Sequence, residues 1–179
     1  MTDLHRDPVV NVINNGIRRG IQVALDNDCF GSAVILIYAG IDAMAFLNMP
    51  GNQEDVESCD FIEWVDKYIK FPCKEQLTGN DLYGARCGML HSYSAFSRMS
   101  RNGECRNIGY MDHSVPEIRF NPEISKSLVL VSIEGLAKAF FEGLDKFLID
   151  VFSKKEKADI VEERFKKLVH TLPINLDVK

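Results

Sequence analysis

The chain carries one long apolar stretch, Ser32 to Met49, which reads SAVILIYAGIDAMAFLNM. Asp42 is its only charged residue. A helix that is apolar on all sides either lies at the centre of a protein or spans a membrane. No second stretch of this kind follows it. We therefore expect a soluble helical bundle in which residues 32–48 form the central helix.

Segments with apolar residues at helical spacing flank this stretch on both sides. They predict further helices over residues 8–28, 58–69, 81–96, 133–151 and 156–170. The helix over 133–151 has the clearest amphipathic pattern, and Ser132 is its expected N-cap. The helix over 58–69 is predicted to have its N-cap at Ser58 or Asp60. The helix over 81–96 is predicted to have its N-cap at Asn80 or Asp81.

From Arg98 to Val131 the sequence loses the helical period and contains Gly103, Gly109, Pro116 and Pro122, and we place a β insertion over residues 104–131. Within them, Ile108–Met111 and Leu128–Val131 are predicted to be short strands that pair as a hairpin with a long loop. The expected fold is therefore mainly α. A single domain spans residues 1–179, with a core bundle over 8–152, a small β-hairpin insertion and a C-terminal helix.

Composition limits the class of protein. The 179 residues are 46% hydrophobic and carry a net charge of −5, which argues against a broad nucleic-acid-binding surface but allows a local basic patch. The first residues lack the apolar core of a signal peptide, so a cytoplasmic protein without membrane attachment is expected. The five cysteines have no metal-binding spacing, and we predict free thiols with no metal and no cofactor.

The segment from Leu82 to Ser92, LYGARCGMLHS, is the strongest candidate for a functional site. At 100° per residue, Arg86 falls within an apolar stripe, whereas Gly84, Gly88 and His91 mark the opposite side. Glycines let a second backbone approach closely. The pattern therefore predicts a helix held between its own core and a second surface, with Arg86 and His91 near the seam.

A guanidinium on an apolar face needs a partner, because an unpaired buried charge is very unfavourable. Asp42 is the expected partner of Arg86, and Asp66 on the preceding predicted helix is an alternative. An Arg86–Asp42 pair would serve a purely structural role or would orient a catalytic arginine. His91 would equally serve to fill an interface and bond to a backbone carbonyl.

The Arg-x4-His spacing of Arg86 and His91 on a mid-chain helix, within this helical layout, resembles the HEPN superfamily (higher eukaryote and prokaryote nucleotide-binding domains). The resemblance covers residues 8–152. A second match to the spacing, Arg106 to His113, falls across a predicted strand and turn instead of a helix. The family consists of α-bundles that dimerise through the motif helix. Many members are metal-independent endoribonucleases, and others are inactive.

The resemblance implies a homodimer that cleaves RNA, or binds RNA or a nucleotide, with Arg86 and His91 as the catalytic pair. His91 would transfer protons and Arg86 would bind the phosphate. About 140° separates the two residues around the helix axis, so each would meet its partner across the dimer seam. Tyr83 and Cys87 are supporting residues. Cys87 departs from the family, whose active members carry Asn, Asp or His after the arginine.

Three arginines, Arg98, Arg101 and Arg106, follow the motif helix and either contact a phosphate backbone or lie on a solvated loop. Tyr93 is expected to pack against the protein. The alternative function comes from another class. It is a non-catalytic HEPN-like dimerisation module that binds a small partner protein or a small ligand, as half of a toxin–antitoxin or regulatory pair.

Overall fold

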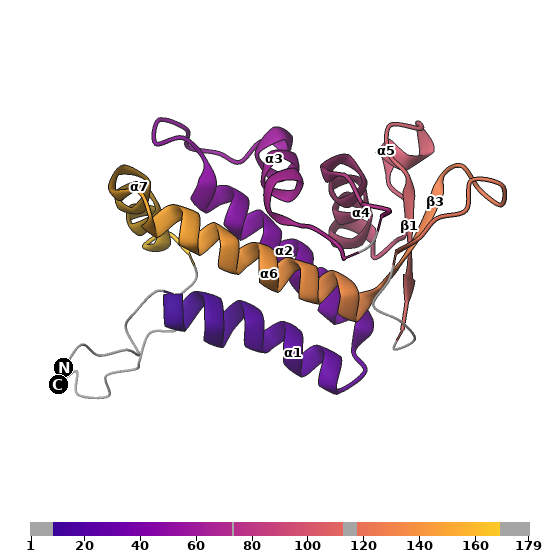
Figure 1. The fold of residues 1–179 in the computed structure, drawn as a ribbon, viewed down its shortest axis with the longest axis horizontal. Coiled ribbons are helices and arrows are strands. Elements are labelled where there is room, and N and C mark those ends of the chain that lie inside the picture. The colour runs from indigo at the N-terminus through magenta and orange to yellow at the C-terminus, as the bar shows by residue number, and fades with distance from the viewer. Residues whose placement is uncertain (1–8, 73, 113–117, 169–179) are drawn as a thin grey trace.

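The computed structural model describes residues 9–72, 74–112 and 118–168. It is mainly helical, with a small sheet at one end (Figure 1). In chain order the elements are η2 (Val9–Arg18), α1 (Arg19–Asp26), α2 (Phe30–Asn48), α3 (Ser58–Tyr68), α4 (Gly79–Ser92), α5 (Arg98–Arg101), β1 (Asn107–Met111), β2 (Ile118–Arg119), β3 (Leu128–Ser132), α6 (Ile133–Phe152) and α7 (Lys155–Phe165). The predicted helix over 8–28 is therefore present, with a π-helical first half.

Helix α2 lies at the centre of the bundle, as its sequence predicts. Figure 1 shows α6 crossing in front of it, α1 on one side and α3 and α4 on the other. Trp64 of α3 is fully buried against α6, with its ring 6.1 Å from Phe140 and 6.0 Å from Phe147. By length and composition α2 is also able to cross a membrane, but half of its apolar window is buried inside the protein.

Two helices begin earlier than their predicted caps. The N-cap of α3 is Glu57 and that of α4 is Thr78. The predicted caps Asp60 and Asp81 instead stand three residues later, and each accepts a hydrogen bond from the backbone N–H of the cap residue. This is the capping-box arrangement, in which the cap and the third helical residue satisfy each other's free N–H groups.

Helix α4 ends at Ser92, four residues before its predicted end. Tyr93 adopts a left-handed backbone with φ of 50° and donates its N–H to the carbonyl of Met89. A left-handed residue directly after a helix turns the chain away from the helix axis. Phe96, the last residue of the predicted helix, lies beyond its observed end and is exposed.

The predicted β-hairpin is wrong in the direction of its strands. The sheet has the order β1-β3-β2, and β1 runs parallel to β3, with Asn107 opposite Leu128. Parallel neighbours need a crossover of a dozen or more residues, and the connection over residues 112–127 is long enough. It also contains β2, which pairs antiparallel with β3 and is too short to show a periodic pattern.

Helix α7 is docked on the end of α2 by a buried arginine. Arg164 donates to the backbone carbonyls of Met49, Pro50 and Gln53, just beyond the C-terminus of α2, and lies over the ring of Phe46. A cation is favoured at this end of a helix, and the carbonyls satisfy its N–H groups. The predicted helix continued to residue 170. Observed α7 ends at Phe165, and residues 169 and 170 lie outside the described chain.

We expect Arg164→Ala to lower the free energy of unfolding by at least about 2 kcal/mol, because it leaves buried carbonyl groups without donors. Lys166→Ala changes an exposed cation on the same segment and should stay within about 0.5 kcal/mol of the wild type. Urea unfolding followed by circular dichroism measures both. Equal stability of the two variants would show that Arg164 does not hold α7 in place.

Candidate active site on helix α4

The predicted partnership of Arg86 and Asp42 is present. The Arg86 Nε and Nη2 atoms both lie 2.9 Å from Oδ2 of Asp42. The two side chains are 23% and 26% exposed, so the pair sits at the edge of the core. The alternative partner Asp66 instead accepts a hydrogen bond from the backbone N–H of Gly79, at the start of α4.

Burial has a larger effect on Asp42 than its partner does. Desolvation raises the pKa of Asp42 above its usual value, although the hydrogen bond and charge of Arg86 and the charge of His91 act in the opposite direction. For Arg86, burial disfavours the charge, but the Asp42 hydrogen bond and charge outweigh it and the pKa is raised. Arg86 therefore stays charged at neutral pH, and His91 lies within the electrostatic reach of Asp42.

A cavity of about 330 Å³ opens beside this pair, between α2, α4 and the start of α3. Asp42, Tyr83 and Arg86 line it, together with Phe61 and Glu57. The guanidinium of Arg86 lies 5.9 Å from the centre of the Tyr83 ring. Cys87 adjoins the same group, since it influences the pKa values of Arg86 and Tyr83. The structure therefore brings Arg86, Asp42, Tyr83 and Cys87 together.

His91 is exposed near the end of α4 and does not line that cavity. Five residues separate it from Arg86, which places the two on different sides of the helix. Within one chain they are therefore connected only through the electrostatic influence of Asp42. A phosphate held by Arg86 of this chain would lie on another side of α4 from the His91 imidazole.

The glycine face of α4 is covered by the same chain, which differs from its predicted role as a contact with a second chain. A Cβ at Gly84 would lie 2.3 Å from the Cys105 Sγ atom, and one at Gly88 would lie 2.5 Å from the carbonyl oxygen of Ser94. Both glycines are buried. The close approach they permit is used by the turn after α4 and by the segment before β1.

Arg106 is a structural residue and not an available phosphate ligand. Its Nη2 lies 2.6 Å from Oδ2 of Asp81, and its Nη1 lies 2.7 Å from Oε1 of Glu75. It also donates to the carbonyl of Gln76 and lies over the ring of Phe120. The prediction that Arg106 contacts phosphate is corrected for this reason. Arg106 and His113 form the second match to the Arg-to-His spacing, and His113 lies outside the described residues.

Arg106→Met should lower the free energy of unfolding by about 3–5 kcal/mol at pH 7, because it leaves the Asp81 carboxylate buried without a counterion. Burial alone would raise the pKa of Asp81, but hydrogen bonds from Arg106 and Thr78 hold it below its usual value. In the wild type, Asp81 therefore stabilises the fold above its unfolded pKa of about 3.9, and this contribution is lost as the pH falls through the folded pKa.

The variant should weaken this dependence. Without the Arg106 side chain, the folded pKa of Asp81 moves up toward its unfolded value, and only the hydrogen bonds from Thr78 and from the backbone N–H of residue 106 still lower it. Urea unfolding between pH 3 and 7 measures the slope, and Asp81→Asn in the Arg106→Met background serves as the control that removes it. An unchanged slope in Arg106→Met would refute the assigned pairing.

Two arginines and two aromatic residues share the exposed surface after α4. Arg98 and Arg101 lie on α5, and no ion pair is found for either within the described parts of the chain. Tyr93 is 65% exposed and Phe96 is 57% exposed. The exposure of Tyr93 differs from its predicted packing against the protein. The early end of α4 instead brings both rings to the surface, and no periodic signal marks that end.

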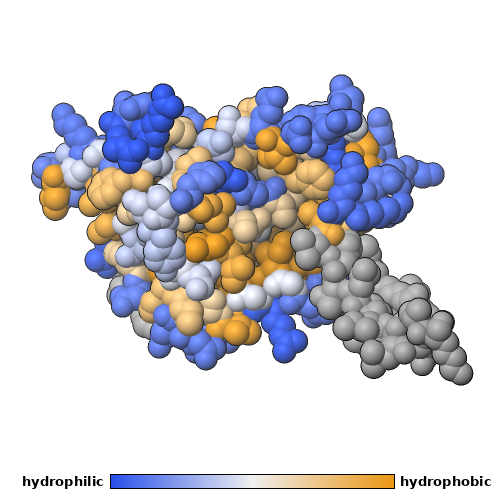
Figure 2. Space-filling view, turned by 180° about the vertical axis from the view of Figure 1, so that it is seen from behind, coloured by the Kyte–Doolittle hydropathy of each residue, from blue (hydrophilic) through white to orange (hydrophobic). Residues whose placement is uncertain are grey.

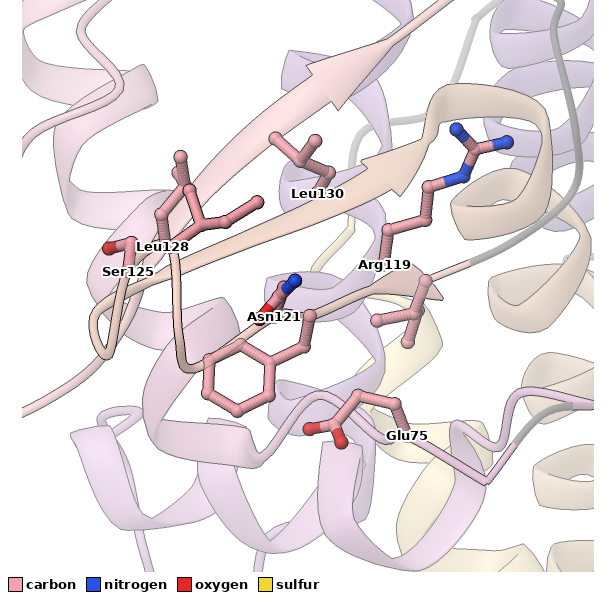
Figure 3. Close-up of a pocket in the computed structure, with 9 residues that line it drawn as sticks. Glu75, Arg119, Asn121, Ser125, Leu128 and Leu130 are labelled. Carbon is pink, nitrogen blue, oxygen red and sulfur yellow. The ribbon is translucent and has the colours of Figure 1, made fainter.

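Further cavities lie elsewhere. The one in Figure 3 has a volume of about 460 Å³ and lies at the sheet, where Leu128 and Leu130 project from β3 and Glu75 lies on the opposite side. It contains none of the predicted catalytic residues. In the described parts of the chain, no group of three or more His, Cys, Asp or Glu side chains has the arrangement of a metal site.

Comparisons of the chain with protein-family models, with curated proteins and with solved structures give no match. The resemblance to the HEPN superfamily therefore rests on the residues of α4 and on the helical layout, and it remains a proposal.

Proposed function

We propose that this protein is a HEPN-like, metal-independent endoribonuclease that binds single-stranded RNA at the exposed end of α4. The observation that carries the proposal is the set of side chains exposed at this end of the helix. It presents an exposed histidine, two arginines without a carboxylate partner among the described residues, and two exposed aromatic rings, all within residues 91–101. Arginines and aromatic rings suit the phosphates and bases of a single strand.

The chemistry requires few protein groups, because RNA supplies its own nucleophile, the 2′-hydroxyl. His91 would accept or donate the proton, because an imidazole ring can do either. Asp42 holds Nε and Nη2 of Arg86, so Nη1 is the donor available to a phosphate oxygen. Because the two side chains point to different sides of α4, the reacting pair would combine Arg86 of one chain with His91 of a second.

The first test is incubation of the purified protein with labelled single-stranded RNAs in EDTA. We expect cleavage that falls by at least about 100-fold in His91→Ala, the scale on which a lost general acid or base slows a reaction. Arg86→Lys keeps the charge but loses the planar fork, and it should also be impaired. A 2′-deoxy nucleotide at the cleaved position should block the reaction. Lys138→Ala, an exposed cation on α6, is the control and should cleave normally.

A second candidate is the non-catalytic module that holds a partner protein or a small ligand. One observation favours it. Asp42 and Glu57 bring two carboxylates to the cavity of Arg86, which weakens the attraction of that cavity for a phosphate. RNA binding without cleavage by the folded wild type would exclude the nuclease and leave a binding module. Failure to bind RNA at all would favour a protein or small-ligand partner.

We also propose that the protein is a homodimer and that the second copy covers α2. Figure 2 shows hydrophobic side chains gathered across the middle of the back of the molecule, over α2. Leu36 and Ala39 of α2 are exposed, and Ala43 is half-buried. A two-fold axis at Ala39 would place the large side chains of one copy, such as Ile35, against small ones of the other, such as Ala43.

This interface would adjoin the candidate site, because Asp42 lies three residues from Ala39 on the same helix. We propose this interface in place of the predicted one on the glycine face of α4, because the chain itself covers that face. Such a seam would bring the Arg86 cavity next to the second chain.

Leu36→Glu should convert the dimer into a monomer, since a charge on an apolar self-contact is repelled by its own symmetry copy. Ile149→Glu is the matched control, because Ile149 is an exposed apolar residue on α6, outside the proposed interface. Sedimentation velocity reports the mass of each. A monomeric wild type at high concentration would contradict the proposal, and association of α2 with lipid vesicles would identify a membrane as its partner instead.

A further inference from the structure

Tyr93 has an unusual backbone for a large side chain. It follows α4 directly, with φ of 50° and ψ of 39°. Residues with a Cβ seldom adopt this left-handed conformation, because the Cβ crowds the following carbonyl. Where such strain persists, the surrounding structure holds it in place, and binding sites are common locations for it. The conformation takes the Tyr93 ring off the axis of α4 and onto the start of α2.

The phenol of Tyr93 occupies the place of a side chain at Gly31. A Cβ built on Gly31 would lie 1.7 Å from the Tyr93 hydroxyl oxygen and 2.7 Å from its Cζ. Only glycine at position 31 admits the ring in this position. Tyr93 nevertheless remains 65% exposed. The hydroxyl end of the ring therefore lies against the backbone of Gly31, and most of the ring surface is open.

Gly31 also lines a cavity of about 590 Å³ between α2, α4, β1 and α6, so the Tyr93 ring lies at its margin. Most of the walls are apolar, and they are formed by Phe30, Val34, Met89, Tyr110, Met111 and Ile133. The volume is within the range of small-molecule sites, which are mostly apolar with a few polar groups. Asp112 is the only charged residue among the described residues of the lining.

These features suit a flat, apolar group that carries N–H donors. The oxygens of the Asp112 carboxylate can accept hydrogen bonds from such donors. An open aromatic ring offers a stacking surface to any planar group, and single-stranded RNA is bound by proteins in this way. His91 lies two residues before Tyr93, and the arginines of α5 begin five residues after it. Groups suited to the phosphates therefore flank Tyr93 in the sequence.

We propose that Tyr93 and this cavity bind one nucleobase of single-stranded RNA, with the base stacked on the Tyr93 ring and its edge facing Asp112. The inference rests on the proposed RNA-binding function and names the part of the RNA that this surface holds. Gly31 is then a positioning residue, because it admits the ring into its place without touching the RNA.

The test is binding of fluorescently labelled single-stranded oligoribonucleotides to the full-length protein, measured by anisotropy. Tyr93→Leu should weaken binding by about 5- to 100-fold, the range measured when stacking on a base is lost, whereas Tyr93→Phe should bind within a few-fold of the wild type. Gly31→Ala should weaken binding to a similar degree, because its Cβ displaces the ring. Lys138→Ala is the control with unchanged affinity, and circular dichroism establishes that each variant is folded.

A second arm needs no protein variant. An abasic nucleotide is placed at each position of the oligonucleotide in turn, which removes a base and keeps the phosphates. The wild type should lose affinity at one position, and Tyr93→Leu should show no further loss there, because both changes remove the same contact.

Three results would overturn the inference. RNA binding that is equally tight in wild type, Tyr93→Leu and Gly31→Ala would do so, as would indifference to every abasic position. Either leaves the proposed RNA-binding function standing. Absence of RNA binding by the wild type would overturn the proposed function and this inference together.

Discussion

The burial of α2 is the constraint on which the rest of the fold depends. Its side chains are apolar around the whole circumference, and each large one that is fully buried contributes about 1.5–3 kcal/mol relative to exposure. No single neighbour can cover a helix on all sides. Helices α1, α3, α6 and α7 therefore all pack against it, and the chain between them takes the paths that allow this. In the described structure, Leu36 and Ala39 of α2 remain exposed, and to their face we assign a second copy.

The positions of the charged residues near the core follow from the same constraint, because each buried charge requires a specific partner. Asp42 on α2 determines where Arg86 lies, Asp81 and Arg106 hold the start of α4 against the sheet, and Arg164 attaches α7 to the end of α2. Breaking such a pair is far more unfavourable than losing a pair at the surface. The position of the candidate catalytic arginine is thus a consequence of how the bundle packs.

The end of α4 links fold to function. A left-handed Tyr93 stops the helix, and the turn that follows packs against Gly88. The residues from 93 to 96, which the predicted helix would have contained, are outside it, and both of their aromatic rings are exposed. These rings and the arginines of α5 follow His91 closely in the sequence. The proposed RNA-binding surface exists only because the helix ends where it does.

Periodicity and composition determined much of this protein. They were sufficient for the central position of α2, for α6 with its Ser132 cap, and for the Arg86–Asp42 pair, because each follows from local spacing or from the need of a lone charge for a partner. Only the tertiary structure decided the parallel pairing of β1 with β3, the partners of Arg106 and the cover over Gly84. These depend on residues far apart in the chain, such as Asp81 and Arg106, whose contact no local pattern encodes. From the sequence alone, Gly84 would fit a dimer interface and Arg106 a phosphate site. The fold excludes these roles because other parts of the same chain already contact both residues.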